Sequence, residues 1–307
     1  MTLQEAAEKQ ARRVQLADLS VIPKAAMVVK EDRILWCGPE ADLSAFVQKS
    51  GEEVTTIDLQ GRDVLPGLVD CHSHLIFAGL RAHEFEMRMQ GASYQDIARQ
   101  GGGILNTVKA TREASEDQLF AQALGRVKKY LAQGVTTIEV KSGYGLDKQN
   151  ELKMLRVVHK LAQADYGNVA GKVIGKDEGE IEVFLPSSSS RSARGTCPRI
   201  VPTFLGAHAV PPEFSLAAEY LDYLNHHVLS EARLLASRLD IFIENRYFDL
   251  SAKQFLINAQ KMGFDLVIHA DQLSRSGGSS LAVELGARSA DHLLEINYED
   301  IQNLASS

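Results

Sequence analysis

From residue 64 onward, short apolar runs alternate with stretches whose apolar positions recur at helical spacing. The apolar runs predict strands at 65–69, 135–140, 199–205, 240–243, 266–268 and 288–291, the first of them buried. The helical stretches are 119–131, 150–164, 212–239, 251–263 and 279–285. Strands that alternate with helices favour a parallel sheet with crossover helices. A doubly wound sheet and a closed barrel both satisfy this pattern.

Polar side chains that follow the predicted strands favour the barrel. They are His72, His74, Tyr144, His208, Glu244, His269 and His292. In a barrel the carboxyl ends of all strands meet at one face, where active sites lie, whereas an open sheet spreads them along an edge. We therefore predict an α/β fold of the (β/α)8 TIM-barrel type. Six strand–helix units can be recognised, and eight close such a barrel.

The first 63 residues have a different pattern. Two β-prone runs, 26–30 and 34–37, are bounded by turn residues and predict a small β-rich domain at 1–63, ahead of a barrel domain at 64–307. A polar, Ser-rich stretch at 168–198 lacks helical period and is predicted to be a disordered insertion. Because long structureless loops are uncommon inside compact domains, this stretch is either a surface insertion or an error in the gene model.

Composition and charge restrict the function classes. The chain of 307 residues is 45% hydrophobic and 24% charged, as is usual for a globular protein. Its formal net charge of −7 disfavours binding to nucleic acid or to an anionic membrane. No apolar run is long enough to span a membrane, and the polar residues 1–13 contain no signal core. Three scattered cysteines indicate a reducing compartment. We therefore expect a cytoplasmic protein that binds neither nucleic acid nor membranes.

The residues after the first barrel strand carry the clearest chemistry. In an extended chain, His72 and His74 are two positions apart and project to the same side. Two imidazoles on one face make half of a site for a divalent transition metal. Without further context, a surface pair of histidines with no ligand is an equally good interpretation.

The surrounding sequence decides between these interpretations because it matches a family pattern. The matching stretches are 64–74, 72–115, 141–146, 203–209, 269–272 and 289–292. Together they resemble the amidohydrolase superfamily and, within it, the imidazolonepropionase family of histidine degradation. The resemblance covers roughly residues 20 to 165 and 199 to 300.

The resemblance implies a metal-dependent hydrolase with one zinc or iron ion per subunit. It implies that His72, His74 and His269 bind the metal, and that His269 and His292 are the catalytic residues, with His292 near the attacking water. A metal ion suits the hydrolysis of a cyclic amide because it lowers the pKa of bound water and polarises a carbonyl. An imidazole such as that of His292 can relay a proton near neutral pH.

The substrate implied by the resemblance is 4-imidazolone-5-propanoate, and the product is N-formimidoyl-L-glutamate. Arg81 is expected to bind the propionate, since a guanidinium pairs with a carboxylate through two parallel hydrogen bonds. Tyr144, His208 and Gln272 are expected to surround the flat ring by stacking and hydrogen bonding. The family also implies a homodimer.

Two departures from the family pattern leave alternatives open. The family has only a short link where this chain has 168–198, and it continues for two more strand–helix units after the sixth predicted strand. The carboxylate that completes the family's metal site, on the last barrel strand, has no match here. The chain is therefore expected to be a fragment or a truncated product, so an inactive fragment is one alternative. A related cyclic amidohydrolase or aminohydrolase is another, although Arg81 argues against a neutral substrate.

Overall fold

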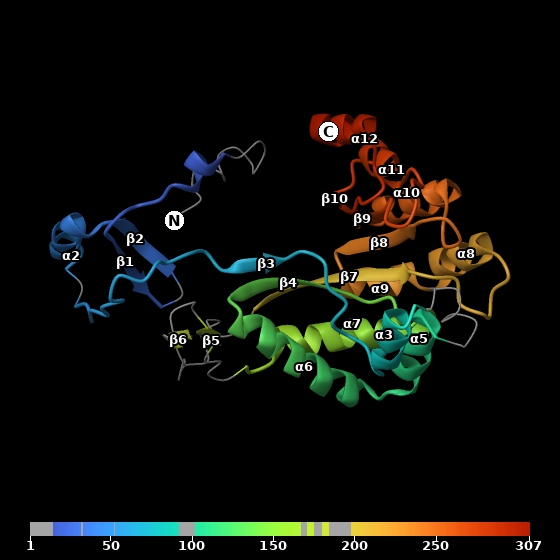
Figure 1. The fold of residues 1–307 in the computed structure, drawn as a ribbon, viewed down its shortest axis with the longest axis horizontal. Helices are drawn as coiled ribbons and strands as arrows, with labels where there is room; N and C mark the ends of the chain where they lie inside the picture. The colour runs from blue at the N-terminus through green and yellow to red at the C-terminus, as the bar shows by residue number, and fades with distance from the viewer. Residues whose placement is uncertain are drawn as a thin grey trace.

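The computed structural model describes residues 15–31, 33–51, 53–91, 102–166, 171–174, 180–183 and 198–307. Its main feature is a six-stranded, fully parallel sheet with the strand order β10-β9-β8-β7-β4-β3. The strands are β3 (Leu68–Asp70), β4 (Val135–Lys141), β7 (Arg199–Ala207), β8 (Arg238–Ile243), β9 (Asp265–Ala270) and β10 (Ser289–His292). The sheet is curled like half of a barrel (Figure 1), and the prediction of six parallel strand–helix units is confirmed.

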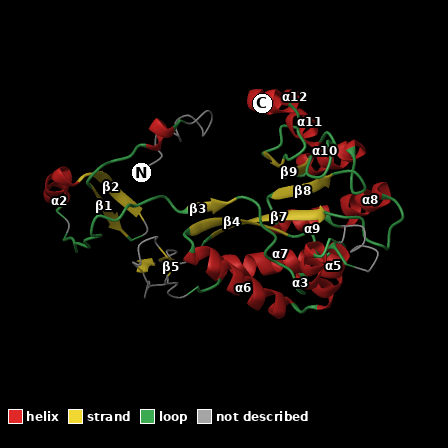
Figure 2. Cartoon of the chain, in the orientation of Figure 1, coloured by secondary structure: helices red, strands yellow, loops and turns green. Residues whose placement is uncertain are grey.

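Helices connect the strands and cover the outer side of the sheet (Figure 2). They are α3 (Ala82–Met89), α5 (Ile104–Glu113), α6 (Glu116–Ala132), α7 (Lys148–Gln163), α8 (Ala217–His227), α9 (Leu229–Leu235), α10 (Lys253–Lys261), α11 (Gly278–Glu284) and α12 (Tyr298–Ser306). Short 3-10 turns occupy Leu16–Leu19, Glu40–Asp42 and Leu250–Ala252. A capping box begins α6, because the side chain and backbone of Ser115 exchange hydrogen bonds with Gln118.

The core consists of two main apolar clusters between the sheet and these helices. One joins β7, β8 and β9 to α8, α9 and α10, with Phe204, Leu239 and Leu256 fully buried. The other joins β4 to α6 and α7, with Leu119, Ile138 and Met154 fully buried. The helices pack against the strands because their apolar faces recur at intervals of three and four residues.

Three predictions about local structure are wrong. The run 65–69 is not a buried strand: the strand is Leu68–Asp70, and Leu68 and Val69 are 55% and 65% exposed. Within the described residues β3 lies at the edge of the sheet, pairs with β4 alone, and is not covered on its faces. The helix expected at 212–239 is split into α8 and α9, with the fully buried side chain of Val228 at the break.

The third wrong prediction concerns the start of α10. The helix was expected from residue 251, but a 3-10 turn precedes it and the helix begins at Lys253. The carboxylate of Asp249 caps that turn by accepting the backbone N–H of Ser251 at 2.9 Å.

The N-terminal part of the chain forms a separate small sheet. β1 (Ala25–Lys30) and β2 (Arg33–Pro39) pair in antiparallel fashion, and α2 (Leu43–Ser50) follows them. Figure 1 shows this hairpin beside the amino end of β3, away from the other strands of the large sheet. The domain boundary at residue 63 stays a prediction.

The insertion predicted at 168–198 lies largely outside the described residues. Its described part is not loop: β5 (Gly171–Ile174) and β6 (Glu180–Val183) pair as a short antiparallel hairpin. Among the described helices of the whole chain, none has the length and apolar character needed to cross a membrane.

Candidate active site and metal centre

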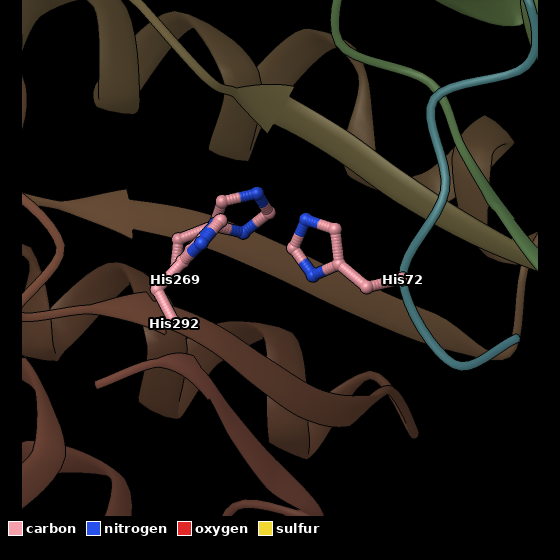
Figure 3. Close-up of side chains that lie close together, drawn as sticks. All are labelled: His72, His269 and His292. Carbon is pink, nitrogen blue, oxygen red and sulfur yellow. The ribbon is translucent and has the colours of Figure 1, made fainter. Parts of the chain in front are cut away.

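The curl of the sheet brings its two edge strands together at their carboxyl ends. His72 follows β3 at one edge, and His292 ends β10 at the other. Their ring centroids are nevertheless only 4.7 Å apart. His269, near the end of β9, lies 4.4 Å from His72 and 4.9 Å from His292 (Figure 3). The predicted meeting of strand ends at one face is therefore observed for these histidines.

A second group of rings continues the cluster on the other side of His269. The ring of His74 lies 5.6 Å from that of His269 and stacks on His208 at 5.1 Å. Tyr144 lies 5.7 Å from His74 and 5.4 Å from His208. The loops after β3, β4 and β7 and the end of β9 thus contribute to one aromatic cluster. The sequence predicted this meeting for the four residues His74, Tyr144, His208 and His269.

His269 is common to three groups of possible metal ligands. These groups, each with its ligand atoms within 4.8 Å of one another, are His72–His269–His292, His74–His208–His269 and Asp240–His269–Asp291. None of the three combines His72 with His74. The ligand set expected from the sequence, with both of these histidines and His269, therefore stays a prediction, while His269 has the central position that a ligand requires.

The chemistry of the cluster fits a transition metal. Within the described part of the chain, His74 Nδ1 and both ring nitrogens of His269 are buried and have no hydrogen-bond partner. A buried polar nitrogen without a partner is costly, and a bound metal ion would supply one. Burial, together with the charge of neighbouring histidines, lowers the pKa of His74 and His269 well below the ordinary value. Both rings are therefore neutral near pH 7, as metal ligands must be.

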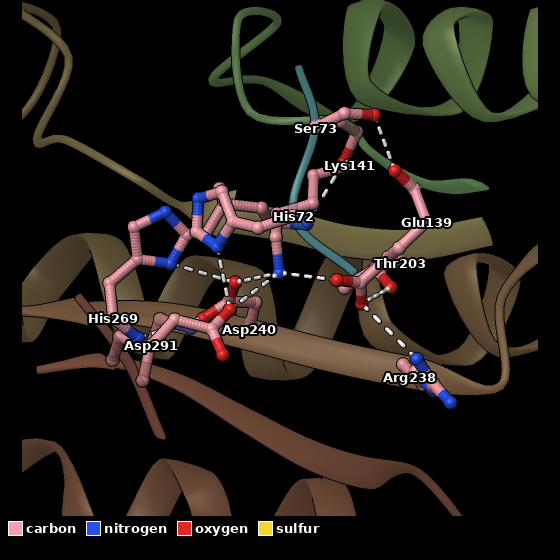
Figure 4. Close-up of polar contacts among 12 residues, drawn as sticks. His72, Ser73, Glu139, Lys141, Thr203, Arg238, Asp240, His269 and Asp291 are labelled. Atoms are coloured by element: carbon pink, nitrogen blue, oxygen red, sulfur yellow. Dashed lines mark hydrogen bonds and ion pairs between the residues drawn. The ribbon is translucent and has the colours of Figure 1, made fainter. Parts of the chain in front are cut away.

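Carboxylates and one lysine lie directly beneath the histidines (Figure 4). Asp291 Oδ2 accepts a hydrogen bond from His72 Nδ1 at 2.6 Å. Asp240 Oδ2 lies 2.8 Å from His269 Nδ1, although this pair is not aligned as a hydrogen bond. Lys141 Nζ lies 2.7 Å from Asp240 and 3.3 Å from Asp291. Such carboxylates commonly fix the orientation of metal-binding imidazoles.

Asp240, Asp291 and Lys141 were not among the residues predicted for the site. The available signal was the occurrence of charged residues inside apolar strands: Lys141 ends β4, Asp240 lies within β8, and Asp291 precedes His292 on β10. All-apolar runs are the rule for strands buried on both faces, so a buried charge in such a strand indicates a specific partner.

The positions of the predicted substrate-binding residues differ in how closely they approach the cluster. His208 Nδ1 hydrogen-bonds to the carbonyl oxygen of Gly143 at 3.0 Å, and burial lowers the pKa of His208 to about 4. Burial raises the pKa of Tyr144, and the positive charge of Arg81 partly opposes this. Arg81 precedes α3, is exposed, and lies 3.8 Å from Glu84. The loops therefore bring Arg81 within electrostatic range of Tyr144.

Gln272 is half-buried in the loop after β9. The buried carboxylate of Glu244, which follows β8, holds this loop by accepting the backbone N–H groups of Leu273 and Ser274 at 2.8 and 3.2 Å. Glu244 was noted in the sequence only as a polar residue after a strand. Its contacts identify it as a support for the loop that carries Gln272.

His292 has an unusual backbone conformation. Its φ angle is +74°, and that of the following Leu293 is +57°. Residues other than glycine rarely adopt positive φ, and such conformations concentrate at functional sites. The backbone at the end of β10 therefore supports a functional role for the exposed imidazole of His292.

Comparison with solved structures identifies the class of fold. A 5-methylcytosine deaminase from Klebsiella pneumoniae, liganded with phosphonocytosine, superposes with a TM-score of 0.53 and 15% identity over 87% of this chain and 55% of that one. The ochratoxinase of A. niger gives a TM-score of 0.50 at 14% identity, over 92% and 58%. The fold is of the amidohydrolase type, as predicted.

Sequence relatives are more specific. No protein-family model matches the chain. The imidazolonepropionase of Bdellovibrio bacteriovorus is 45% identical over 311 residues, covering 100% of this chain and 65% of that protein. Those of Legionella pneumophila and Shewanella baltica are 43% and 40% identical, over 63% and 64% of their lengths. The chain is thus related to imidazolonepropionases, which confirms the resemblance seen in the sequence, and it spans just under two thirds of their length.

Proposed function

We propose that this chain supplies the metal-binding and substrate-binding residues of an imidazolonepropionase-type hydrolase. The reaction is the hydrolysis of the cyclic amide in 4-imidazolone-5-propanoate to N-formimidoyl-L-glutamate in histidine degradation. The observation that carries the proposal is the gathering of His72, His74, His208, His269 and His292 at one end of the sheet, in a chain 45% identical to an imidazolonepropionase.

The metal is one zinc or iron ion per subunit, held by His72, His74 and His269. Imidazole nitrogens suit both metals, and the buried nitrogens of His74 and His269 that lack hydrogen-bond partners among the described residues support this choice. A bound ion of either kind supplies Lewis acidity and lowers the pKa of a water molecule. The pairing of His72 Nδ1 with Asp291 leaves Nε2 of that ring as the ligand atom.

The organic substrate is held by residues from four loops, which follow β3, β4, β7 and β9. Arg81 binds the propionate, and its exposed position before α3 leaves the guanidinium able to pair with a carboxylate. Tyr144 and His208 border the ring, since they already form one aromatic cluster with His74. Gln272 offers an amide to the ring N–H or carbonyl from the loop held by Glu244.

His292 and His269 are the proposed catalytic residues. His292 is exposed at the edge of the cluster, 4.9 Å from His269 between ring centroids. From that position its imidazole can take a proton from the attacking water and return it to the ring nitrogen that leaves. His269 orients the reacting groups from the centre of the cluster.

The test compares metal content and hydrolysis in the purified chain and in two histidine variants. His269→Ala is expected to lose bound zinc or iron, whereas His159→Ala, which loses a hydrogen bond to the carbonyl oxygen of Leu235, is expected to keep it. Turnover of 4-imidazolone-5-propanoate that depends on added metal supports the proposal. Equal metal content in both variants would contradict it.

The alternatives predict different results in the same experiment. A chain that binds one metal ion per molecule at His269 without any turnover is the inactive-fragment alternative. Turnover of another cyclic amide or an aminopurine, but not of the imidazolone, identifies a related hydrolase. We further propose a cytoplasmic homodimer, which light scattering of the purified protein tests for the oligomeric state.

A further inference from the structure

Lys141 is a fully enclosed charge in the described part of the site. Its side chain is 0% exposed, and its Nζ atom faces three carboxylates. The distances from Nζ are 2.7 Å to Asp240 Oδ2, 3.0 Å to Glu139 Oε2 and 3.3 Å to Asp291 Oδ2. A lysine is almost never fully buried unless it is paired, so this position requires a specific reason.

Each carboxylate around Lys141 makes a second contact, and two of these contacts are with histidines of the metal centre. Asp291 accepts the hydrogen bond from His72 Nδ1 at 2.6 Å. Asp240 Oδ2 lies 2.8 Å from His269 Nδ1, and Asp240 Oδ1 accepts the backbone N–H of the same histidine at 3.2 Å. A single ammonium group is thus shared by the carboxylates that face the two rings.

The third carboxylate anchors the lysine to the sheet and faces no histidine. Glu139 Oε1 accepts the hydroxyl hydrogen of Thr203 at 2.5 Å and lies 3.5 Å from Arg238 Nη1. Glu139 and Lys141 are two positions apart on β4, so their side chains lie on the same face of the sheet. The network therefore spans β4, β7, β8, β9 and β10 (Figure 4).

We infer that Lys141 is a positioning residue that fixes the two histidines through Asp240 and Asp291. The ammonium holds Asp291 in its hydrogen bond with Nδ1 of His72, and it holds Asp240 2.8 Å from Nδ1 of His269. The facing negative charge favours a proton on Nδ1 of each ring, which leaves Nε2 able to bind a metal ion. A carboxylate can only accept a hydrogen bond, which determines the tautomer of the ring it faces. The inference rests on the proposed metal centre, but it concerns the rings in the metal-free chain.

Two other roles for Lys141 fit the geometry less well. A lysine that ligates or bridges metal ions has to lose its positive charge, whereas three carboxylates within 3.3 Å stabilise the ammonium form. The group Asp240–His269–Asp291 is also a poor site for a second metal ion, since the ammonium already occupies the space between its two carboxylates.

The first test is the tautomeric state of His72 and His269 in the metal-free protein. Nitrogen-15 NMR of the histidine-labelled full chain distinguishes a ring that carries its proton on Nδ1 from one that carries it on Nε2. We expect the Nδ1-protonated form for both rings in the wild type. If either ring is mainly protonated on Nε2, the inference is wrong, whatever the activity of the enzyme.

The second test uses Lys141→Met, because the methionine side chain is similar in length to that of lysine and carries no charge. We expect the Nδ1-protonated pattern to be lost and the affinity for Co²⁺, followed by its visible absorption, to fall about 10- to 100-fold. Lys160→Met is the matched control, because Lys160 also pairs with two carboxylates, Glu116 and Asp117, but on the surface. Its tautomers and its Co²⁺ affinity should equal those of the wild type.

A narrower variant remains informative if Lys141→Met does not fold. Asp291→Asn keeps the contacts of Lys141 with Asp240 and Glu139, and it alters the partner of His72 together with the longest of the three contacts of Lys141. Its amide can donate as well as accept, so the Nε2-protonated form of His72 should increase while His269 is unchanged. Unchanged tautomers in every folded variant, together with unchanged Co²⁺ affinity, would overturn the inference. The proposed function fails separately, if the wild type neither binds metal nor hydrolyses the imidazolone.

Discussion

His72 and Asp291 connect the two opposite edges of the six-stranded sheet. His72 follows β3 and Asp291 lies on β10, the first and last strands in the order of the sheet, yet His72 Nδ1 is 2.6 Å from Asp291 Oδ2. Within the described strands, β3 and β10 share no backbone hydrogen bonds. This side-chain contact therefore links the two edges of the sheet at the end where the histidines gather.

Asp291→Ala should destabilise the fold more than the loss of a surface pair does. Removal of the carboxylate leaves the half-buried His72 Nδ1 without its partner and takes one of three counter-charges from Lys141, which costs about 1.5–3 kcal/mol. Urea denaturation monitored by circular dichroism measures the difference in the free energy of unfolding between Asp291→Ala and the wild type.

The control for this prediction is another aspartate that faces a histidine. Asp222 lies 3.1 Å from His226 on the surface of α8, where the two side chains are 73% and 61% exposed. Asp222→Ala should change stability by about 0–1 kcal/mol. Equal effects of the two substitutions would mean that the link between the sheet edges contributes nothing beyond an ordinary surface pair.

Arg81→Gln should weaken substrate binding without changing the metal centre. If the guanidinium pairs with the propionate, its loss removes charge-assisted hydrogen bonds that contribute about 1.5–3 kcal/mol, which raises the dissociation constant about 10- to 100-fold. Calorimetric titration with 4-imidazolone-5-propanoate measures this change. Arg88→Gln, on the exposed helix α3 that follows Arg81, should bind like the wild type. An unchanged constant in Arg81→Gln would remove Arg81 from the substrate site.

The parallel sheet and the gathering of histidines could be predicted from the sequence because both follow from local patterns. Alternating strands and helices determine that the strand ends share one side, so His72, His74, His208, His269 and His292 were expected to meet there. Which rings pair with which was not predictable. The structure puts His74 with His208 and His72 with His292, an arrangement that depends on loop conformations.

The charged network beneath the histidines was missed because its contacts are distant in sequence. Lys141 is 99 residues from Asp240 and 150 from Asp291. A pattern within one strand can show that a charge is unusual but not which residue balances it. Burial of the first strand was mispredicted for a related reason: Leu68 and Val69 are apolar, but their exposure depends on β3 lying at an edge of the described sheet.

Glu151 provides a prediction about pH. Its fully buried carboxylate accepts the backbone N–H groups of Gly143, Gly145 and Leu146 at 2.8–3.0 Å, and so holds the loop that carries Tyr144. Burial raises the pKa of Glu151, although these hydrogen bonds partly oppose the shift. The folded state then binds a proton more readily than the unfolded state. This contribution to stability is complete below the unfolded pKa of about 4.3 and is lost as the pH rises through the folded pKa.

Glu151→Gln should remove this pH dependence. The amide keeps fewer of the loop's hydrogen bonds, so the variant is less stable by about 1–3 kcal/mol at pH 4. Only the wild type loses stability as its carboxylate ionises. The difference in the free energy of unfolding between the two proteins should therefore narrow as the pH rises above 4. Urea denaturation of both proteins at several pH values tests this. A difference that widens with pH would show that the hydrogen bonds outweigh burial. Glu219→Gln, at an exposed position on α8, is the control and should follow the wild type throughout.

The loop held by Glu151 also leaves no space for a side chain at Gly145. A Cβ atom there would lie 2.4 Å from the backbone nitrogen of Glu151 and 2.6 Å from the carbonyl carbon of Asn150. Since both are backbone atoms at the start of α7, Gly145→Ala must displace the loop and should destabilise the fold by about 1–3 kcal/mol. Displacement of Tyr144 should also weaken binding of the imidazolone.

Gly125→Ala is the control and should stabilise the fold. A Cβ atom at this exposed position of α6 meets nothing within 4 Å, and helix propensity favours alanine by about 1 kcal/mol. Thermal denaturation of the two variants therefore distinguishes a glycine needed for close backbone contact from one that is merely tolerated, and stabilisation by both substitutions would refute the proposed packing of the Tyr144 loop.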